Sequence, residues 1–200
     1  MAMKFFEAVR NRRTIYDISN EAVISHEQIT EIIEQAVLHT PSAFNSQSSR
    51  VILLLEKEHE KFWQMLKDKF KEILPADRYP TTQEKIDTCF ACGYGTVLFF
   101  EEQAEVKKLQ DQFPLYADNF PVWSQHASAM LQYVIWTGLE MYGLGCSLQH
   151  YSPLIDDKIK ETWQVPDSWQ LVAQMPFGKK IGEPGAKEFA PLAKRLKVYK

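Results

Sequence analysis

The chain has 200 residues, of which 45% are hydrophobic and 24% are charged, and it carries a formal net charge of −3 at pH 7. This length and composition suit one folded domain with a proper core, so we expect residues 1–200 to form a single domain. The weakly acidic balance gives no electrostatic reason to expect nucleic acid or an anionic membrane as a partner.

The chain shows no targeting or membrane signal. Residues 1–7 contain no apolar run of signal-peptide length, and no stretch approaches the roughly 18 apolar residues of a membrane span. The three cysteines, Cys89, Cys92 and Cys146, form no even disulfide framework, which agrees with a reducing compartment. We therefore expect a cytoplasmic protein.

The first part of the chain predicts two helices. Apolar residues at positions 5, 6 and 9 favour a short helix that ends in a basic cluster at residues 10–13. A longer helix then begins at Ser25, a candidate N-cap, because Gln28 stands three residues later and completes a capping box. Apolar residues between 29 and 37 follow at helical spacing, and Pro41 ends this helix.

Three apolar runs predict the strands of a central sheet. Residues 51–55 and 96–100 are continuous apolar runs, typical of strands covered on both faces, and residues 169–175 predict a third strand.

The remaining segments predict further helices and a tail. We expect helices over residues 58–74, 101–112 and 120–142, with a Pro/Thr-rich connection before residue 96. Ser152 and Pro153 predict the N-cap and first residue of another helix that runs to about Trp163, and an irregular tail starts at Phe177. This order predicts a sheet sandwiched by helices, of the α/β or α+β class, and leaves the strand order open.

Several patterns argue against other kinds of site. The glycine pairs at 93/95 and 143/145 do not follow the strand–glycine–helix order of a dinucleotide fingerprint. Cys89 and Cys92 form a single CxxC, without the second pair that a zinc site needs or the strand-to-helix context of a redox motif. The histidines show no metal-ligand spacing, so we expect no metal site.

Arg12, Arg13 and Thr14 form a candidate anion site. Two guanidinium groups and a hydroxyl can together collect the oxygens of a phosphate. The alternative is a solvated basic helix end, which the helix dipole favours.

The segment from Pro41 to Gln47 is a candidate site for a flat ligand. Asn45 and Gln47 each carry donors and an acceptor, and with Ser42 they can read the edge of a heterocycle. The alternative is a polar turn after a helix, with Phe44 as a core plug.

Two later positions can contribute to the same kind of site. Gln149 and His150, followed by Tyr151, come after the glycines that end the long helix, and they can cover one face of a flat ligand. Lys187 lies in the glycine-rich tail and can reach a phosphate as a point charge, with a solvated tail as the alternative. We assign no side chain as an obligate acid or base.

In this order the motifs resemble the nitroreductase family, FMN-dependent enzymes that reduce nitro compounds and quinones with a nicotinamide donor, and the resemblance covers nearly the whole chain. Residues 95–101, 148–156 and 196–199 are similar to the subgroup that contains the yeast fatty-acid-repression-mutant-like proteins and their bacterial copper-induced relatives. The resemblance implies an α+β three-layer sandwich with a central, mostly antiparallel sheet flanked by helices, assembled as an intertwined homodimer.

The resemblance also implies the cofactor site. The arginine motif and the tail lysine would hold the FMN phosphate and ribityl chain, and the segment after Pro41 would contact the isoalloxazine from the other subunit. The implied FMN-binding residues are Arg12, Arg13, Thr14, Ser42, Ala43, Asn45, Gln47, Gln149, His150 and Lys187. Many members carry an arginine close to Phe189, so here Lys187 would supply the cation of the tail alone.

The implied activity is transfer of electrons from NAD(P)H to nitroaromatic or quinone acceptors by a ping-pong mechanism. A second hypothesis is a flavin-holding stress or regulatory protein whose reductase activity is incidental, and a third is a relative without cofactor. The sequence does not choose between NADH and NADPH or name the acceptor. Residues 113–121 are a candidate mobile lid.

Overall fold

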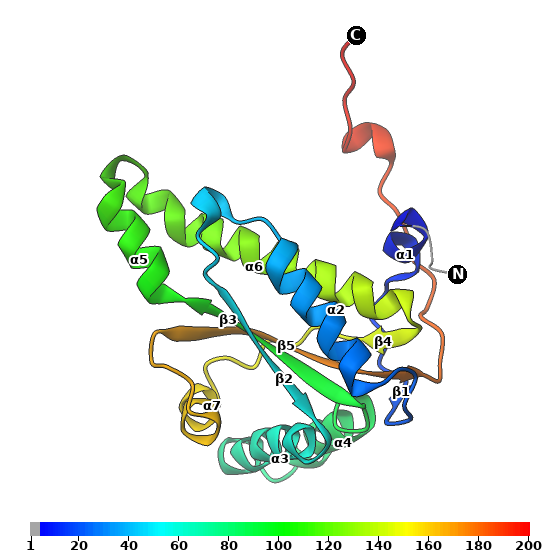
Figure 1. Cartoon of the computed structure of the whole chain (residues 1–200). Helices are drawn as coiled ribbons and strands as arrows, with labels where there is room; N and C mark the ends of the chain where they lie inside the picture. The colour runs from blue at the N-terminus through cyan, green and yellow to red at the C-terminus, as the bar shows by residue number, and fades with distance from the viewer. Residues whose placement is uncertain (1–4) are drawn as a thin grey trace.

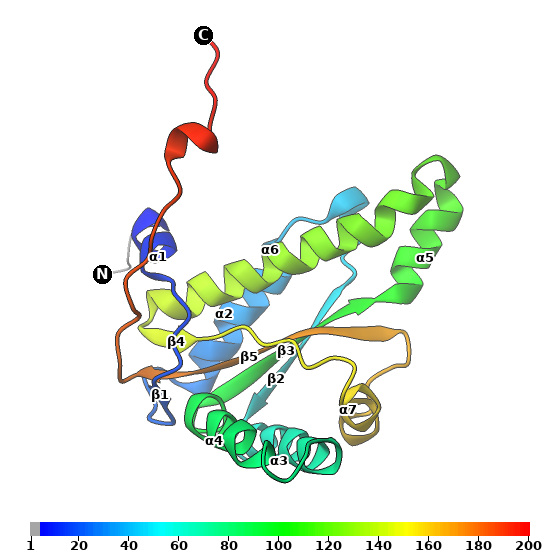
Figure 2. The same ribbon diagram turned by 180° about the vertical axis from the view of Figure 1, so that it is seen from behind.

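An antiparallel sheet lies between two layers of helices in the computed structural model, which describes residues 5–200 (Figures 1 and 2). The strands are β1 (Ile18–Ser19), β2 (Ser49–Leu55), β3 (Gly95–Glu102), β4 (Leu144–Cys146) and β5 (Trp169–Lys180). Their order is β1-β5-β3-β2, with β4 also paired to β5, and each of these pairings is antiparallel. The predicted α+β sandwich with a mostly antiparallel sheet is therefore confirmed.

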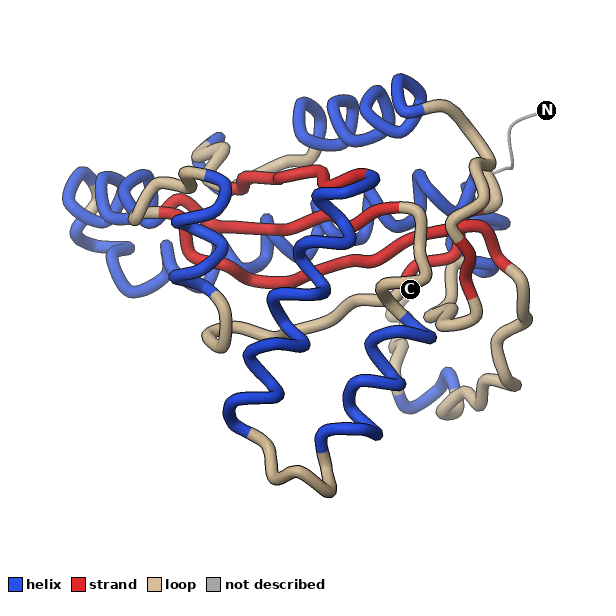
Figure 3. The backbone as a smooth tube through the Cα atoms, turned by 90° about the horizontal axis from the view of Figure 1, so that it is seen from below, coloured by secondary structure: helices blue, strands red, loops and turns tan. Residues whose placement is uncertain are grey.

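Helices cover both faces of this sheet (Figure 3). They are α1 (Phe5–Asn11), α2 (His26–His39), α3 (Glu56–Ile73), α4 (Tyr79–Cys89), α5 (Gln103–Gln112), α6 (Phe120–Met141) and α7 (Asp156–Trp163), with short 3-10 helices η1 (Ala43–Asn45), η2 (Pro114–Asn119) and η3 (Leu192–Lys194). α2 and α6 pack on one face, and α3, α4 and α7 pack on the other. Among residues 5–200, none of the helices is long and apolar enough to cross a membrane. Residues 1–4, on which the expectation of no signal peptide partly rests, lie outside the described part of the chain.

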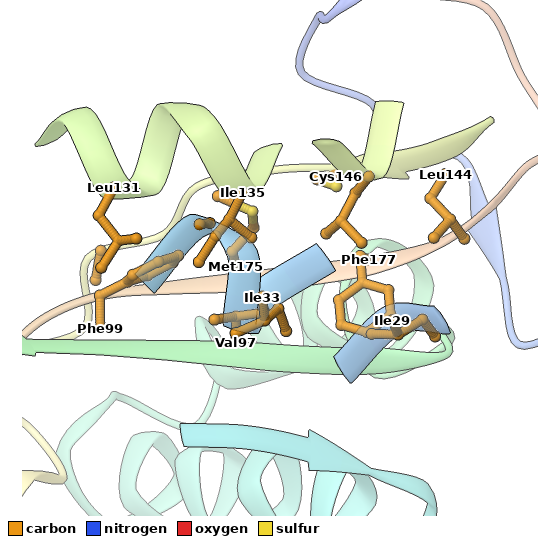
Figure 4. Packing of buried hydrophobic residues seen from close by; sticks show 13 residues of the cluster. Ile29, Ile33, Val97, Phe99, Leu131, Ile135, Leu144, Cys146, Met175 and Phe177 are labelled. Carbon is orange, nitrogen blue, oxygen red and sulfur yellow. The ribbon is translucent and has the colours of Figure 1, made fainter. Parts of the chain in front are cut away.

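The central strand β3 supplies core residues to both layers. Val97 and Phe99 pack into the cluster under α2 and α6, whereas Leu98 and Phe100 pack into the cluster over α3, α4 and α7. This division follows from the pleat, because successive side chains of a strand point to opposite faces. Figure 4 shows the first cluster, in which Phe99 lies beneath Leu131 of α6. The prediction of a strand covered on both faces is confirmed for β3, whereas most residues of the edge strand β2 are only partly buried.

The start of α2 follows the predicted capping box. The hydroxyl of Ser25 accepts a hydrogen bond from the backbone nitrogen of Gln28 at 3.3 Å, and the side-chain oxygen of Gln28 accepts one from the backbone nitrogen of Ser25 at 3.1 Å. These bonds satisfy two donors that an uncapped helix end would leave unpaired.

Two predictions for the middle of the chain are wrong. Helix α4 forms where we predicted a connection. Pro80 stands in its first turn, where a helix needs no N–H donor, and Ile86 is buried in the cluster with residues of α3 and β3. Strand β3 continues through Glu101 and Glu102, so the next helix begins at Gln103 instead of residue 101. Strand pairing with β2 and β5 on both sides overrides the helical preference of the two glutamates.

Two further corrections concern the C-terminal part. Strand β5 runs on to Lys180, because β1 and β4 pair with its end, so Phe177 belongs to the core and not to the tail. Ser152 and Pro153 are joined by a cis peptide bond and do not start a helix. The Ser152 hydroxyl instead donates a hydrogen bond of 2.7 Å to Asp156, where α7 begins.

Candidate functional site

The loop from Ser42 to Gln47, which includes η1, joins α2 to β2 with an unusual backbone. Phe44, Asn45 and Gln47 have φ angles of 56°, 51° and 47°, a left-handed region that residues other than glycine and asparagine rarely adopt. The hydroxyl of Ser42 accepts a hydrogen bond of 2.9 Å from the backbone nitrogen of Gln47 and so closes the loop. Because Asn45 and Gln47 are exposed, their amides can reach a ligand.

Phe44 docks this loop on the start of α6. Its ring lies 4.9 Å from that of Phe113, 5.3 Å from that of Phe120 and 6.0 Å from that of Trp123, which it stacks against. The side chain remains 50% exposed, so Phe44 is part of a surface aromatic cluster and not the core plug that we considered. The loop is therefore held at the N-terminal end of α6.

Arg12 lies at the opposite end of α6. Its guanidinium carbon is 4.5 Å from the centre of the Trp136 ring and 5.6 Å from that of Tyr133. The Nε atom of Arg12 is buried and has no hydrogen-bond partner in the structure. Arg12 is thus not a freely solvated helix end, and its Nε donor has no acceptor among residues 5–200.

The residues after Arg12 connect the tail to this end of the molecule. A guanidinium nitrogen of Arg13 donates a hydrogen bond of 2.9 Å to the backbone oxygen of Gly185, two residues before Lys187. Thr14 is exposed and forms a parallel bridge with Cys146 of β4. The ammonium of Lys187 lies 5.3 Å from the centre of the Phe189 ring, on the exposed tail.

Gln149 and His150 lie beyond the end of β4. The Gln149 side chain is buried and donates a hydrogen bond of 3.0 Å to the Ser147 hydroxyl, and its backbone pairs with Gln174. His150 is exposed. Tyr151 turns away into the core of α3 and α4, where burial raises the pKa of its phenol to about 12. The structure therefore separates Tyr151 from the two residues before it.

Within one chain the predicted residues form two separate groups. Trp123, beside the loop, and Trp136, beneath Arg12, are 13 positions apart in α6, which corresponds to roughly 20 Å along the helix axis. The first group contains Ser42, Ala43, Asn45 and Gln47, and the second contains Arg12, Arg13 and Thr14, with Lys187 attached through the tail. Gln149 and His150, where the chain pairs with Gln174 of β5, belong to neither group. The structure does not bring the two groups together in a single chain.

Two lysines at the end of β5 form ion pairs and are not free to bind a phosphate. Lys179 pairs with Glu21 at 2.5 Å, and Lys180 pairs with the buried carboxylate of Glu140 at 2.5 Å. The pairing of Glu140 on α6 with Lys180 on β5 is a tertiary contact that we did not predict. A cavity of about 480 Å³ beside this pair is also lined by Arg13.

The cysteines and histidines show no feature of a reactive or metal site. The Cys92 thiol donates a hydrogen bond to the backbone oxygen of Thr88 at 3.0 Å, and burial raises the pKa of this thiol. Burial also raises the pKa of Cys146. In the described part of the chain, no group of three or more histidine, cysteine or acidic side chains is placed to hold a metal ion.

A family comparison agrees with this fold and with these motifs. The model of the nitroreductase family matches residues 9–179, so the chain belongs to the nitroreductase family. The chain is 31% identical over 189 residues to nitroreductase FRM2 of Saccharomyces cerevisiae, with 92% of each protein covered.

Solved structures share the architecture. Nitroreductase CinD from Lactococcus lactis in complex with chloramphenicol is 40% identical, with a TM-score of 0.90 over 98% of this chain and 100% of that one. CinD has also been solved with 4-nitrophenol and with nicotinic acid. A nitroreductase from Desulfitobacterium hafniense with bound FMN is 15% identical, with a TM-score of 0.70 and full coverage of both chains, and shows the same fold.

Proposed function

We propose that this protein is a single-domain, FMN-dependent oxidoreductase over residues 1–200 that transfers electrons from NAD(P)H to nitroaromatic or quinone acceptors in a ping-pong order. Membership of the nitroreductase family supports the reaction class. The complexes of CinD with chloramphenicol and 4-nitrophenol support a nitroaromatic acceptor for a protein that is about 40% identical.

The observation that carries the proposal is the environment of Arg12. Its half-buried side chain is held over Trp136 and Tyr133, its Nε has no hydrogen-bond partner among residues 5–200, and Arg13 and Thr14 follow it in sequence. A phosphate supplies several anionic oxygens, and guanidinium groups bind them with charge-assisted hydrogen bonds. Lys187 would add a point charge, because the Arg13–Gly185 hydrogen bond holds the start of the tail at this end. These residues fit the phosphate end of FMN.

The first group, on the loop from Ser42 to Gln47, fits the ring end of FMN. Asn45 and Gln47 present exposed amides on a loop that aromatic packing and the Ser42 hydroxyl hold in place. Amides can donate to and accept from the pyrimidine edge of an isoalloxazine. Gln149 and His150 would cover one face of the isoalloxazine ring.

A homodimer brings the two groups together. They lie roughly 20 Å apart on α6 within one chain, so one FMN would be held by Arg12 of one subunit and by Gln47 of the other. Helix α6 carries the exposed apolar side chains Val122, Met130 and Val134, which a subunit interface would cover.

The shape of the chain supports an intertwined dimer. Strand β2 is at the edge of the sheet, and a cavity of about 630 Å³ lies between it and α2, lined by Val37, Leu38 and Leu53. The C-terminal tail extends away from the body (Figures 1 and 2) and exposes apolar side chains that include Phe189 and Leu192. An unpaired edge invites a further strand, and we assign this edge and the adjoining cavity to the tail of the second subunit.

In this mechanism the protein binds and orients. FMN, when bound, supplies reversible hydride and electron chemistry, so donor and acceptor can occupy the same position in turn. Arg12 and Lys187 would hold the phosphate charge at one end, and the amides of Asn45 and Gln47 would stabilise negative charge on the ring at the other. We assign no proton transfer to a side chain.

An anaerobic visible spectrum of the purified protein tests the proposal, recorded in separate samples before and after addition of NADH or of NADPH, and again after 4-nitrophenol is added to each. We expect an oxidised flavin spectrum that one donor bleaches within seconds and that the acceptor restores. The donor that bleaches it fastest identifies the coenzyme.

Three other outcomes would count against parts of this proposal. A yellow protein that neither donor reduces would favour the flavin-holding stress or regulatory role. A colourless protein that stays colourless with added FMN would refute the cofactor assignment. Full flavin content and full activity in stable monomers would refute the shared site.

A further inference from the structure

Glu101 is a buried carboxylate that the candidate site does not use directly. It stands near the end of β3, between Ser49 of β2 and Gln170 of β5, and its exposed fraction is 0%. A buried carboxylate is costly unless hydrogen bonds satisfy it. The partners of Glu101 therefore indicate what it stabilises.

Both oxygens of Glu101 accept short hydrogen bonds from consecutive serines. The Ser48 hydroxyl donates to one oxygen at 2.6 Å, and the Ser49 hydroxyl donates to the other at 2.5 Å. The backbone oxygen of Ser48 also accepts from the backbone nitrogen of Glu102 at 2.9 Å. The two residues that immediately follow Gln47 are thus fixed to β3 by three hydrogen bonds.

The loop before these serines has a backbone that requires such support. Phe44 and Gln47 both have positive φ angles, a conformation that is strained for residues other than glycine and persists only where the surrounding structure imposes it. A guanidinium nitrogen of Arg50 donates to the backbone oxygen of Gln47 at 2.5 Å. Glu101 and Arg50 therefore hold the same end of the loop. Glu101 binds the side chains of Ser48 and Ser49, and Arg50 binds the backbone oxygen of Gln47.

We propose that Glu101 is a positioning residue for the cofactor loop: by accepting from Ser48 and Ser49 it holds Gln47 and Asn45 in the conformation that binds flavin. This role rests on the proposed function. Glu101 would not touch the ligand, because its side chain is fully buried and both of its oxygens accept from serine hydroxyls. Its effect passes through the two serines.

Three variants test this role in the full-length protein. Glu101→Leu removes both acceptors, whereas Glu101→Gln keeps the shape, since its amide can accept from one serine and donate to the other. Glu102→Gln is the matched control, because Glu102 caps α5 through the backbone nitrogen of Ala104. The readouts are the FMN dissociation constant, the visible circular dichroism of the bound flavin, and amide hydrogen exchange of residues 42–50 in the FMN-free protein.

We expect Glu101→Leu to weaken FMN binding by about 10-fold or more, the usual effect of losing hydrogen bonds to a charged group. Amide exchange should accelerate in residues 42–50 and stay unchanged in α3. Glu101→Gln should recover most of the affinity and the wild-type dichroism, and Glu102→Gln should match the wild type. If Glu101→Leu does not fold, Ser49→Ala, which leaves the Ser48 bond in place, should show the same changes to a smaller degree.

The outcomes separate the two proposals. A wild-type protein that binds no FMN overturns the proposed function and this role with it. A wild-type protein that binds FMN, with Glu101→Leu or Ser49→Ala binding it equally well, overturns the positioning role alone. Faster exchange throughout the chain, without rescue by Glu101→Gln, also overturns it, because Glu101 would then be a general stability residue.

Discussion

Replacing Arg12 with alanine separates the phosphate role from that of a basic helix end. The contacts of Arg12 show how much the free energy of unfolding should fall when its side chain is removed. The guanidinium lies 4.5 Å over Trp136 and 5.6 Å over Tyr133, and each such contact contributes about 0.5–1 kcal/mol at a partly exposed site. We therefore expect Arg12→Ala to lower the free energy of unfolding by about 1–2 kcal/mol.

The effect on flavin binding should be larger. A hydrogen bond between charged groups contributes about 1.5–3 kcal/mol, which corresponds to a rise in the FMN dissociation constant of about 10- to 150-fold. Arg12→Lys should fall between the wild type and alanine, because lysine keeps the charge but loses the planar fork and much of the stacking.

The assay is titration of flavin-free protein with FMN, followed by quenching of flavin fluorescence, with urea unfolding of each variant alongside. Arg78→Ala is the control, because Arg78 is an exposed arginine outside both groups of candidate residues. A lower stability with unchanged FMN affinity would refute the phosphate role and leave Arg12 as a stacking residue of α6.

Three further predictions concern stability and are measured by urea unfolding. Ser25→Ala removes the hydroxyl of the capping box and should lower the free energy of unfolding by about 1 kcal/mol; no change would mean that the α2 cap is redundant. Gly178→Ala should lower it by roughly 1–3 kcal/mol, because the added Cβ would lie 2.4 Å from the backbone oxygen of Ser19; equal stability would show that β1 moves without cost. Burial lowers the pKa of His59 below 6.5. The stability that neutral His59 provides is therefore complete above pH 6.5. It is lost as the pH falls below this value, at up to about 1.4 kcal/mol per pH unit. His59→Gln should therefore lose less stability than the wild type between pH 7.5 and 5.5, and an equal loss would contradict the assignment.

The sequence alone determined the features that depend on neighbouring residues. The capping box of Ser25 and Gln28 set the start of α2, because both hydrogen bonds lie within one helical turn. The continuous apolar runs predicted β2 and β3 as strands covered on both faces, because burial on two sides leaves no polar alternation. The motifs around Arg12 and Gln47 were also visible as residue types at fixed spacing. Which role each residue has toward FMN stays a prediction.

The tertiary structure decided what depends on residues distant in sequence. The two-residue strand β1 exists because β5 pairs with it, and β5 extends to Lys180 for the same reason, so neither could be read from local propensity. Glu101 was predicted in a helix, and only the pairing of β3 on both sides buries it against two serines more than 50 positions away. The separation of Arg12 from Gln47 likewise follows from where α1 and the loop pack on α6. Packing energy depends on which surfaces meet, and a sequence pattern specifies the surfaces but not their partners.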